Sequence, residues 1–199
     1  MAQVATSQRV RSTVFDLRWN SININTPTSI TLQQYLDHEH DGIDIEYFGG
    51  FDVLAEEALV AVELDISVDV LASYKEQLEQ ELSQSFPDMD VDEMMEYLTW
   101  QEVSADMSLT VFFTLNDFSQ WIRRPATEDE PAELHDDVIT HCYHEAYQLF
   151  RGMFRERVGG TAFNELILPA LDPLDLRELV EDDEGGILRL DADLQPVAD

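Results

Sequence analysis

The chain has 199 residues and a formal net charge of −31 at pH 7, because 42 acidic residues are set against only 11 basic ones. This balance argues against direct binding to nucleic acid, which requires basic patches, and a hydrophobic content of 44% argues against a disordered acidic chain. The acidic residues are spread along the chain and Lys75 is the only lysine, which favours adaptation to high internal salt over a function that needs negative charge, such as cation binding or DNA mimicry.

The first strand is predicted at 14–24, where apolar and polar residues alternate. Phe15 and Trp19 fall on one face of this strand, whereas Ile22 is out of phase with them. Because one extra residue shifts the alternation in this way, we expect a β-bulge near 20–21.

A crossover segment is predicted between the first strand and a second strand that begins near residue 43. Leu32, Tyr35 and Leu36 lie in this segment at helical spacing, which indicates a short helical turn. Two glycines at 49–50 indicate a bend in the second strand.

The clearest pattern in the sequence is at 60–70, where apolar residues alternate with small or acidic ones. Such alternation predicts a strand with one buried face and one wet face, as antiparallel sheets allow. A fourth strand is predicted at 105–115, with Phe112 on its polar face. The intervening residues 74–100 are compatible with helix and are interpreted as a helical insertion.

From 134 to 158 the apolar residues change to helical spacing. The apolar arc is wider than a helix on one sheet requires, so we expect a second subunit or a ligand to cover part of it. Two glycines at 159–160 end the helix, and an apolar loop at 163–171 leads to a short helix at 173–180. The arc consists of two stripes, formed by Val138, Cys142, Ala146, Leu149 and Met153 and by Ile139, Tyr143, Tyr147, Phe150 and Phe154.

These elements predict a protein of the α+β class. A single domain at 1–180 contains a four-stranded antiparallel sheet packed on a long helix, followed by a short C-terminal helix. The residues 181–199 are expected to form an acidic, mobile tail. Free sheet edges and the wide helix arc favour a homo-oligomer.

The order of these elements resembles that of the SecB export-chaperone family. The sharpest match is RERVGGTAFNELILPALDPLDLREL at 155–179, which is similar to the family's helix end, its Gly-Thr-Phe turn, its leucine- and proline-rich loop and its final helix. The match extends over 14–180, but the insertion at 74–100 replaces a tight turn. The resemblance implies a dimer of dimers that acts as an ATP-independent chaperone, or holdase, for unfolded polypeptides and needs no cofactor.

The resemblance also implies a client-binding groove between the first crossover and the last helix. Tyr35 lies near the position of the family's crossover tryptophan, and its place in a connecting segment favours a functional role. The simpler interpretation, in which each groove residue is ordinary core, stays open. The groove residues are Leu32, Tyr35, Leu36, Leu174, Leu176, Leu179 and Val180, with Phe48, Phe51 and Phe163 as weaker candidates.

In the SecB family the motor protein SecA binds the outer face of the sheet through carboxylates on strand one and an apolar–acidic pair on strand four. The matching positions here are Ser21, Asn25, Phe112 and Thr114. Phe112 keeps the apolar member of the strand-four pair, but none of the four positions carries an acid, which puts SecA binding in doubt. An antitoxin of a toxin–antitoxin module is therefore an equally good candidate partner.

Enzyme and metal functions find little support in the sequence. His141, Cys142, His144 and Glu145 cluster on the long helix, but they form no H-E-x-x-H pattern and no distant residues complete a four-ligand site. The acidic run at 88–92 lacks the glycine and the glutamate of a calcium-binding loop. We expect no catalytic residues and no metal. The main alternative to a chaperone is a non-catalytic module that holds one specific partner.

The expected location is the cytoplasm. Cys142 is the only cysteine, so no intramolecular disulfide forms, as is typical of a reducing compartment. The first residues lack the apolar stretch of a signal peptide, and no apolar run approaches the roughly 20 residues that span a bilayer, so membrane insertion is not expected.

Overall fold

The computed structural model describes residues 10–26, 42–70, 103–123, 133–181, 186–191 and 194–196. Its main feature is an antiparallel sheet with the strand order β1-β4-β3-β2-β7, so the α+β class is confirmed. The strands are β1 (Ser12–Asn25), β2 (Ile43–Leu54), β3 (Leu59–Val70), β4 (Ser104–Leu115) and β7 (Gly186–Leu190), with a separate pair formed by β5 (Ile122–Arg123) and β6 (Glu133–Leu134).

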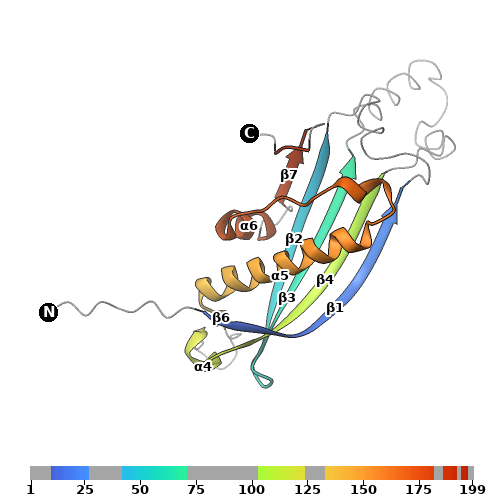
Figure 1. Cartoon of the computed structure of the whole chain (residues 1–199). Helices are drawn as coiled ribbons and strands as arrows, with labels where there is room; N and C mark the ends of the chain where they lie inside the picture. Colours follow the sequence, from blue (N-terminus) through green and yellow to red (C-terminus); the bar gives the residue numbers. More distant parts are fainter. Residues whose placement is uncertain are drawn as a thin grey trace, which may run out of the picture.

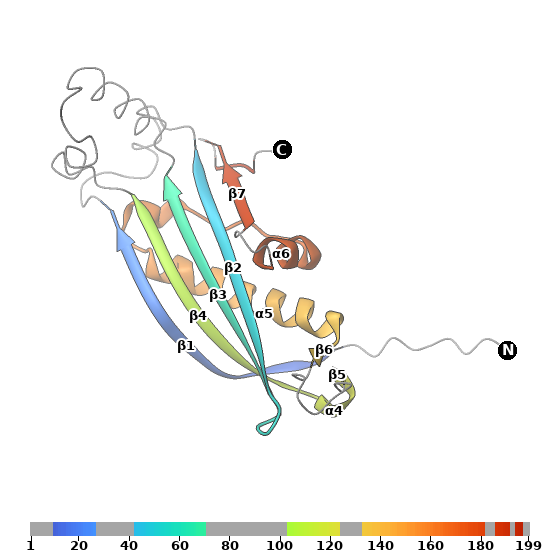
Figure 2. The same cartoon turned by 180° about the vertical axis from the view of Figure 1, so that it is seen from behind.

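The long helix lies across one face of this sheet, and the opposite face carries no helix among the described residues (Figures 1 and 2). We call these the helix face and the outer face. Within the same described part of the chain, no helix is both long and apolar enough to cross a lipid bilayer. The helices are α4 (Phe118–Trp121), α5 (Asp136–Arg157), the 3-10 turn η1 (Ala162–Glu165) and α6 (Pro173–Val180).

The fifth strand corrects the prediction of a four-stranded sheet. Strand β7 pairs with β2, and its last residue, Leu190, is buried. Arg189 donates two hydrogen bonds to the carboxylate of Asp44 on β2, at 2.7 and 2.9 Å. These residues lie within the range for which a mobile tail is predicted, and the structure differs from that expectation. Five residues are too few to display an alternation in an otherwise acidic stretch.

Strand β1 pairs with β4 and is separated from β2 by two other strands. The connection from β1 to β2 therefore joins non-neighbouring strands, as predicted. The three crossover residues of the predicted groove, Leu32, Tyr35 and Leu36, lie outside the described residues, as does the insertion at 74–100.

Two β-bulges interrupt the pairing of β1. The shift between Trp19 and Ser21 confirms the predicted bulge, and a second shift lies between Val14 and Asp16. This second bulge removes Phe15 from the alternation and leaves it 66% exposed, so its predicted place on the face of Trp19 is wrong.

Helix α5 buries most of its two apolar stripes within one chain. The strands β3 and β4 lie beneath one side of the helix, while α6 and the segment 166–172 cover the other. Most of the predicted arc is therefore buried by the same polypeptide, while Leu149 and Met153 stay partly accessible. Cover by a second subunit or a ligand remains a prediction for these two side chains.

Helix α6 packs closely against β2 because residue 49 is a glycine. A Cβ atom at Gly49 would lie 2.7 Å from Cβ of Val180 and 2.9 Å from Cε1 of Tyr143. Both distances are shorter than real Cβ contacts, so any side chain at this position would push α6 or α5 away from the sheet.

We expect Gly49→Ala to lower the free energy of unfolding by about 1–3 kcal/mol, the usual cost of overpacking. Gly50→Ala is the matched control, because a Cβ atom there would meet nothing within 4 Å. Denaturant unfolding of both variants measures the difference, and equal stabilities would contradict the close approach of α6.

Candidate functional site

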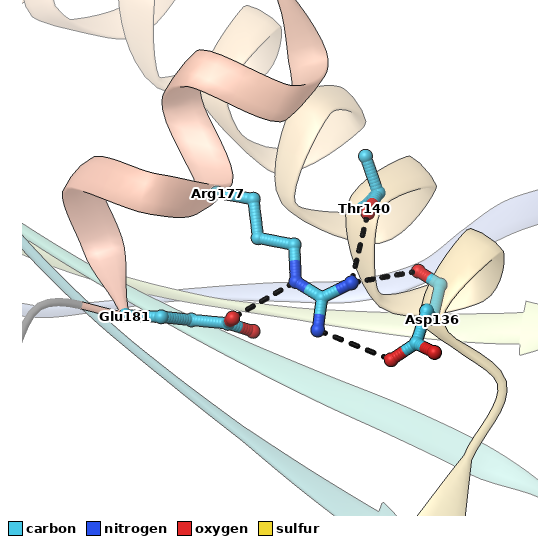
Figure 3. A network of polar contacts seen from close by, with 4 residues as sticks. All are labelled: Asp136, Thr140, Arg177 and Glu181. Atoms are coloured by element: carbon cyan, nitrogen blue, oxygen red, sulfur yellow. Dashed lines mark hydrogen bonds and ion pairs between the residues drawn. The ribbon is translucent and has the colours of Figure 1, made fainter.

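One arginine of α6 makes several polar contacts that join this helix to α5. Arg177 Nε donates to Oε2 of Glu181 at 2.8 Å, and its Nη2 donates to Oδ1 of Asp136 at 3.2 Å (Figure 3). Its Nη1 lies 3.4 Å from the hydroxyl oxygen of Thr140 and 3.5 Å from the carbonyl oxygen of Asp136. The guanidinium group thus links α6 to the first turns of α5.

The segment 166–172 runs back along α5 and is held by side chains of that helix. The hydroxyl of Tyr147 donates to the carbonyl oxygen of Pro169, and Nε of Arg151 donates to that of Leu168, both at 2.9 Å. Since Tyr147 uses its proton in this bond, the hydroxyl of Tyr47 donates to Tyr147 across 3.1 Å. Burial raises the pKa of Tyr147 to about 12, so this chain of hydrogen bonds keeps its protons at neutral pH.

The anchored segment leaves large apolar side chains at the surface. Ile167 is 61% exposed and Leu174, in the first turn of α6, is 62% exposed. Ala170 between them is also exposed, and Leu171 is half-buried. We call these four residues the apolar strip. Leu174 is among the residues predicted from the sequence and the other three are not, although the apolar composition of the loop at 163–171 was the available signal.

Three of the predicted groove residues are core instead. Phe163, Leu176 and Val180 are buried, so their assignment to an open groove is wrong. Leu176 and Val180 are one turn apart on the face of α6 that packs on the sheet and on α5, and Phe163 belongs to η1, the turn that follows α5. Leu179 is half-buried.

Phe48 and Phe51 are both partly exposed, but they lie on opposite faces of β2. Phe48 is opposite Asp65 on the outer face, whereas Phe51 is opposite the buried Val62 on the helix face. Residues three apart on a strand point in opposite directions, so these two side chains do not belong to one groove.

The four residues of the predicted SecA-like face all lie on the outer face, on β1 and β4. Phe112 lies beneath the guanidinium of Arg18, which is 4.8 Å from the ring centre. Asn25 is paired with Ser104, and Ser104 lies eight residues from Phe112 along β4. The strand rise therefore separates Asn25 from Phe112 by roughly 26 Å. The remaining two are Ser21, paired with Ser108, and Thr114, paired with Thr13.

The outer face carries acids at other positions. Asp106 on β4 accepts a hydrogen bond from Ser67 at 2.6 Å, and Glu63 on β3 accepts one from Asn20 at 2.8 Å. Asp65 on β3 is paired with Ser108 and therefore also lies on this face. The absence of acids at the family's positions therefore does not make the face uncharged.

A pocket of about 230 Å³ lies between α5 and the segment 166–168. The side chain of Phe154 forms part of its wall and is buried, whereas Arg155 is exposed at its rim. None of the sequence-predicted site residues lines this pocket. It depends on a contact between residues that are more than ten positions apart, so no local pattern could reveal it.

Two members of the polar cluster on α5, His141 and Cys142, have a structural explanation. His141 Nε2 lies 2.9 Å from the hydroxyl oxygen of Ser12, which ties α5 to the first residue of β1. Burial raises the pKa of the Cys142 thiol to about 12, so this side chain is a poor ligand and a poor nucleophile. In the described ranges, no three His, Cys, Asp or Glu side chains are placed to hold a metal ion.

A scan of the sequence against protein-family models finds no match, and a search of curated proteins finds none either. The resemblance to the SecB family therefore depends on the sequence segment and on the order of elements described above.

We expect Tyr147→Phe to lower the free energy of unfolding by roughly 1–2 kcal/mol, because it removes the hydrogen bond to Pro169 and leaves the hydroxyl of Tyr47 without its acceptor. Tyr143→Phe is the control. It also removes a tyrosine hydroxyl, but this hydroxyl makes no hydrogen bond among the described residues. Denaturant unfolding compares the two, and equal losses would contradict the anchoring role.

The pH dependence of stability provides a test of the His141 environment. Burial lowers the pKa of His141 below its ordinary value of 6.5, so the unfolded chain binds the proton more readily than the folded one. The neutral ring contributes its full stability above about pH 6.5, and this contribution is lost as the pH falls towards the folded pKa. Between about pH 7.5 and about pH 5.5, the melting temperature should therefore fall more for the native chain than for His141→Gln. Parallel curves would contradict this expectation.

Proposed function

We propose that the protein is an ATP-independent holdase that binds non-native polypeptides, as the resemblance to SecB implies. The observation that carries the proposal is the apolar strip. A chain with a net charge of −31 keeps Ile167 and Leu174 more than half exposed. Ile167 lies on the segment fixed by hydrogen bonds to α5, and Leu174 lies in the first turn of α6. Exposed apolar surface on a rigid support, surrounded by charge, is the surface that a holdase needs.

The arrangement of the sheet supports the same proposal. The family's groove lies between the first crossover and the last helix, so these two parts must meet at one edge of the sheet. The crossover leads to Gly42 and β2, and α6 contacts β2 as well as β7. Leu174 and Leu179 of α6 are the described members of the predicted groove on that helix that remain accessible.

Binding on this proposal requires no nucleotide and no side-chain code. An unfolded client gains roughly 25 cal/mol for each Å² of apolar surface that it removes from water. Contacts at several copies of the strip in an oligomer would add through multivalency. The clients are either precursors for export, passed to a SecA motor, or an antitoxin.

The proposed oligomer is a dimer of dimers, and the edge of β1 supports it. Among the described strands β1 pairs only with β4, so its second edge is open. Val14, Phe15 and Ile22 are exposed along this strand. A second copy would satisfy the open peptide groups and cover these side chains.

The test is suppression of aggregation without nucleotide, using several unrelated proteins diluted from denaturant. The native chain should suppress aggregation of all of them near stoichiometric ratio. The double variant Ile167→Asp/Leu174→Asp should require several-fold more protein, because two charged groups replace the apolar contacts. Ile187→Asp is the matched control, since Ile187 is similarly exposed but lies on β7, outside the apolar strip.

Circular dichroism and melting temperatures establish that the three proteins are equally folded. Binding to only one of the denatured proteins would favour the module that holds one specific partner. Equal suppression by the double variant and the control would contradict the role of the apolar strip.

A further inference from the structure

Two arginines in the C-terminal half of α5 place two positive charges close together on a strongly acidic protein. Arg151 and Arg155 are one helical turn apart, so their like charges repel each other. Within the described ranges neither is paired with a carboxylate, although the chain contains 42 acidic residues. Arg151 is bound instead to the carbonyl oxygen of Leu168 and to the amide oxygen of Gln148. The pair is therefore a local cationic site on an anionic protein.

The two arginines flank the pocket between α5 and the segment 166–168. Its apolar lining includes the buried Phe154 and Leu168, and the exposed Ile167 continues from it into the apolar strip. The volume of about 230 Å³ is below the range of roughly 300–1,000 Å³ that is typical of sites for drug-sized ligands and cofactors. The pocket is of a size for a single side chain, and its wall is partly apolar and partly polar.

Gly152 provides a second observation at the same place. It lines the pocket in the middle of α5, where glycine costs helix stability relative to alanine. A Cβ atom at Gly152 would meet nothing within 4 Å, so no packing within the described chain requires glycine here. Glycine in such a position is typical of a backbone that is approached closely from outside.

We propose that this pocket selects clients by binding an apolar side chain while Arg155, assisted by Arg151, pairs with a carboxylate beside it in the client sequence. The occupant is an extended polypeptide in which an apolar residue is followed by Asp or Glu. This inference rests on the proposed holdase function and specifies its substrate class. The arginines supply charge complementarity at short range, where a hydrogen-bonded guanidinium–carboxylate pair is strongest.

The net charge of the protein and the local cationic site predict opposite preferences for the charge of a bound peptide. At long range a charge of −31 attracts basic peptides and repels acidic ones. Salt screens this long-range effect, but it weakens a direct hydrogen-bonded pair much less. The local site therefore predicts a preference for acidic peptides that increases as KCl is raised, whereas net charge alone predicts a preference for basic ones at low salt.

The probes are three fluorescein-labelled peptides of Gly and Ser that carry one central pair, Leu-Glu, Leu-Gln or Leu-Lys. Fluorescence anisotropy in molar KCl measures their binding to the full chain. We expect the Leu-Glu peptide to bind about tenfold more tightly than the Leu-Lys peptide, with the Leu-Gln peptide between them. Equal affinities, or a preference for Leu-Lys, would overturn the proposal.

Variants locate the effect. Arg155→Gln should remove the preference for Leu-Glu, because this exposed side chain supplies the charge and makes no described contact within the fold. Arg157→Gln is the matched control, since it removes the same charge from the same helix. The native Arg157 guanidinium lies over the ring of Trp19, away from the pocket. Gly152→Leu should weaken all three peptides by filling the pocket. Loss of the preference in Arg157→Gln as well would point to general charge and overturn the assignment.

The experiment separates this inference from the proposed function. Aggregation suppression by the native chain, measured on a client poor in acidic residues, tests the holdase function without the proposed carboxylate pair. If the chain suppresses aggregation but shows no peptide preference, only the selectivity is wrong; if it binds Leu-Glu but protects no client, only the holdase function is wrong. A change of oligomeric state on sedimentation of Gly152→Leu, without a change in peptide binding, would assign the pocket to contact between copies and overturn the proposal.

Discussion

The burial of two apolar stripes on α5 is the constraint from which the rest of the structure follows. One sheet covers only part of so wide an arc, so the chain must return along the helix to cover the remainder. The return path is fixed where Tyr147 and Arg151 donate to the carbonyl groups of Pro169 and Leu168. Leu166, Leu168 and Leu176 turn inward in this arrangement, and Ile167 and Leu174 are consequently left facing outward.

The same constraint explains which parts of the fold could be predicted. The alternation in β3 and β4 and the helical spacing in α5 and α6 repeat over enough residues to be recognised, and their positions are confirmed. Strand β7 is too short to repeat its pattern, and the bulge at Phe15 is not visible from composition. Such features are decided by pairing with distant strands, which a local pattern does not contain.

The candidate site was less predictable than the fold for a related reason. Spacing shows that Leu176 and Val180 share a face of their helix, but it does not show whether that face meets the sheet or the solvent. The close approach at Gly49 decides this, because α6 then lies directly on β2. The pocket beside Arg155 likewise exists only once the segment 166–168 has returned to α5.

Strand β7 has a consequence for how copies of the chain can associate. It pairs with Ile43–Tyr47, the first five residues of β2, and replaces that part of the edge with its own. At the end of β7, Leu190 bridges to Pro196, a residue without an amide hydrogen to offer a further strand. In the described part of the sheet, β1 therefore presents an outer edge of 14 residues, whereas β7 presents one of only five that is closed at one end, next to the rest of β2. Such unequal edges favour the pairing of two copies through the longer one over repeated addition at both sides, which would extend into fibres.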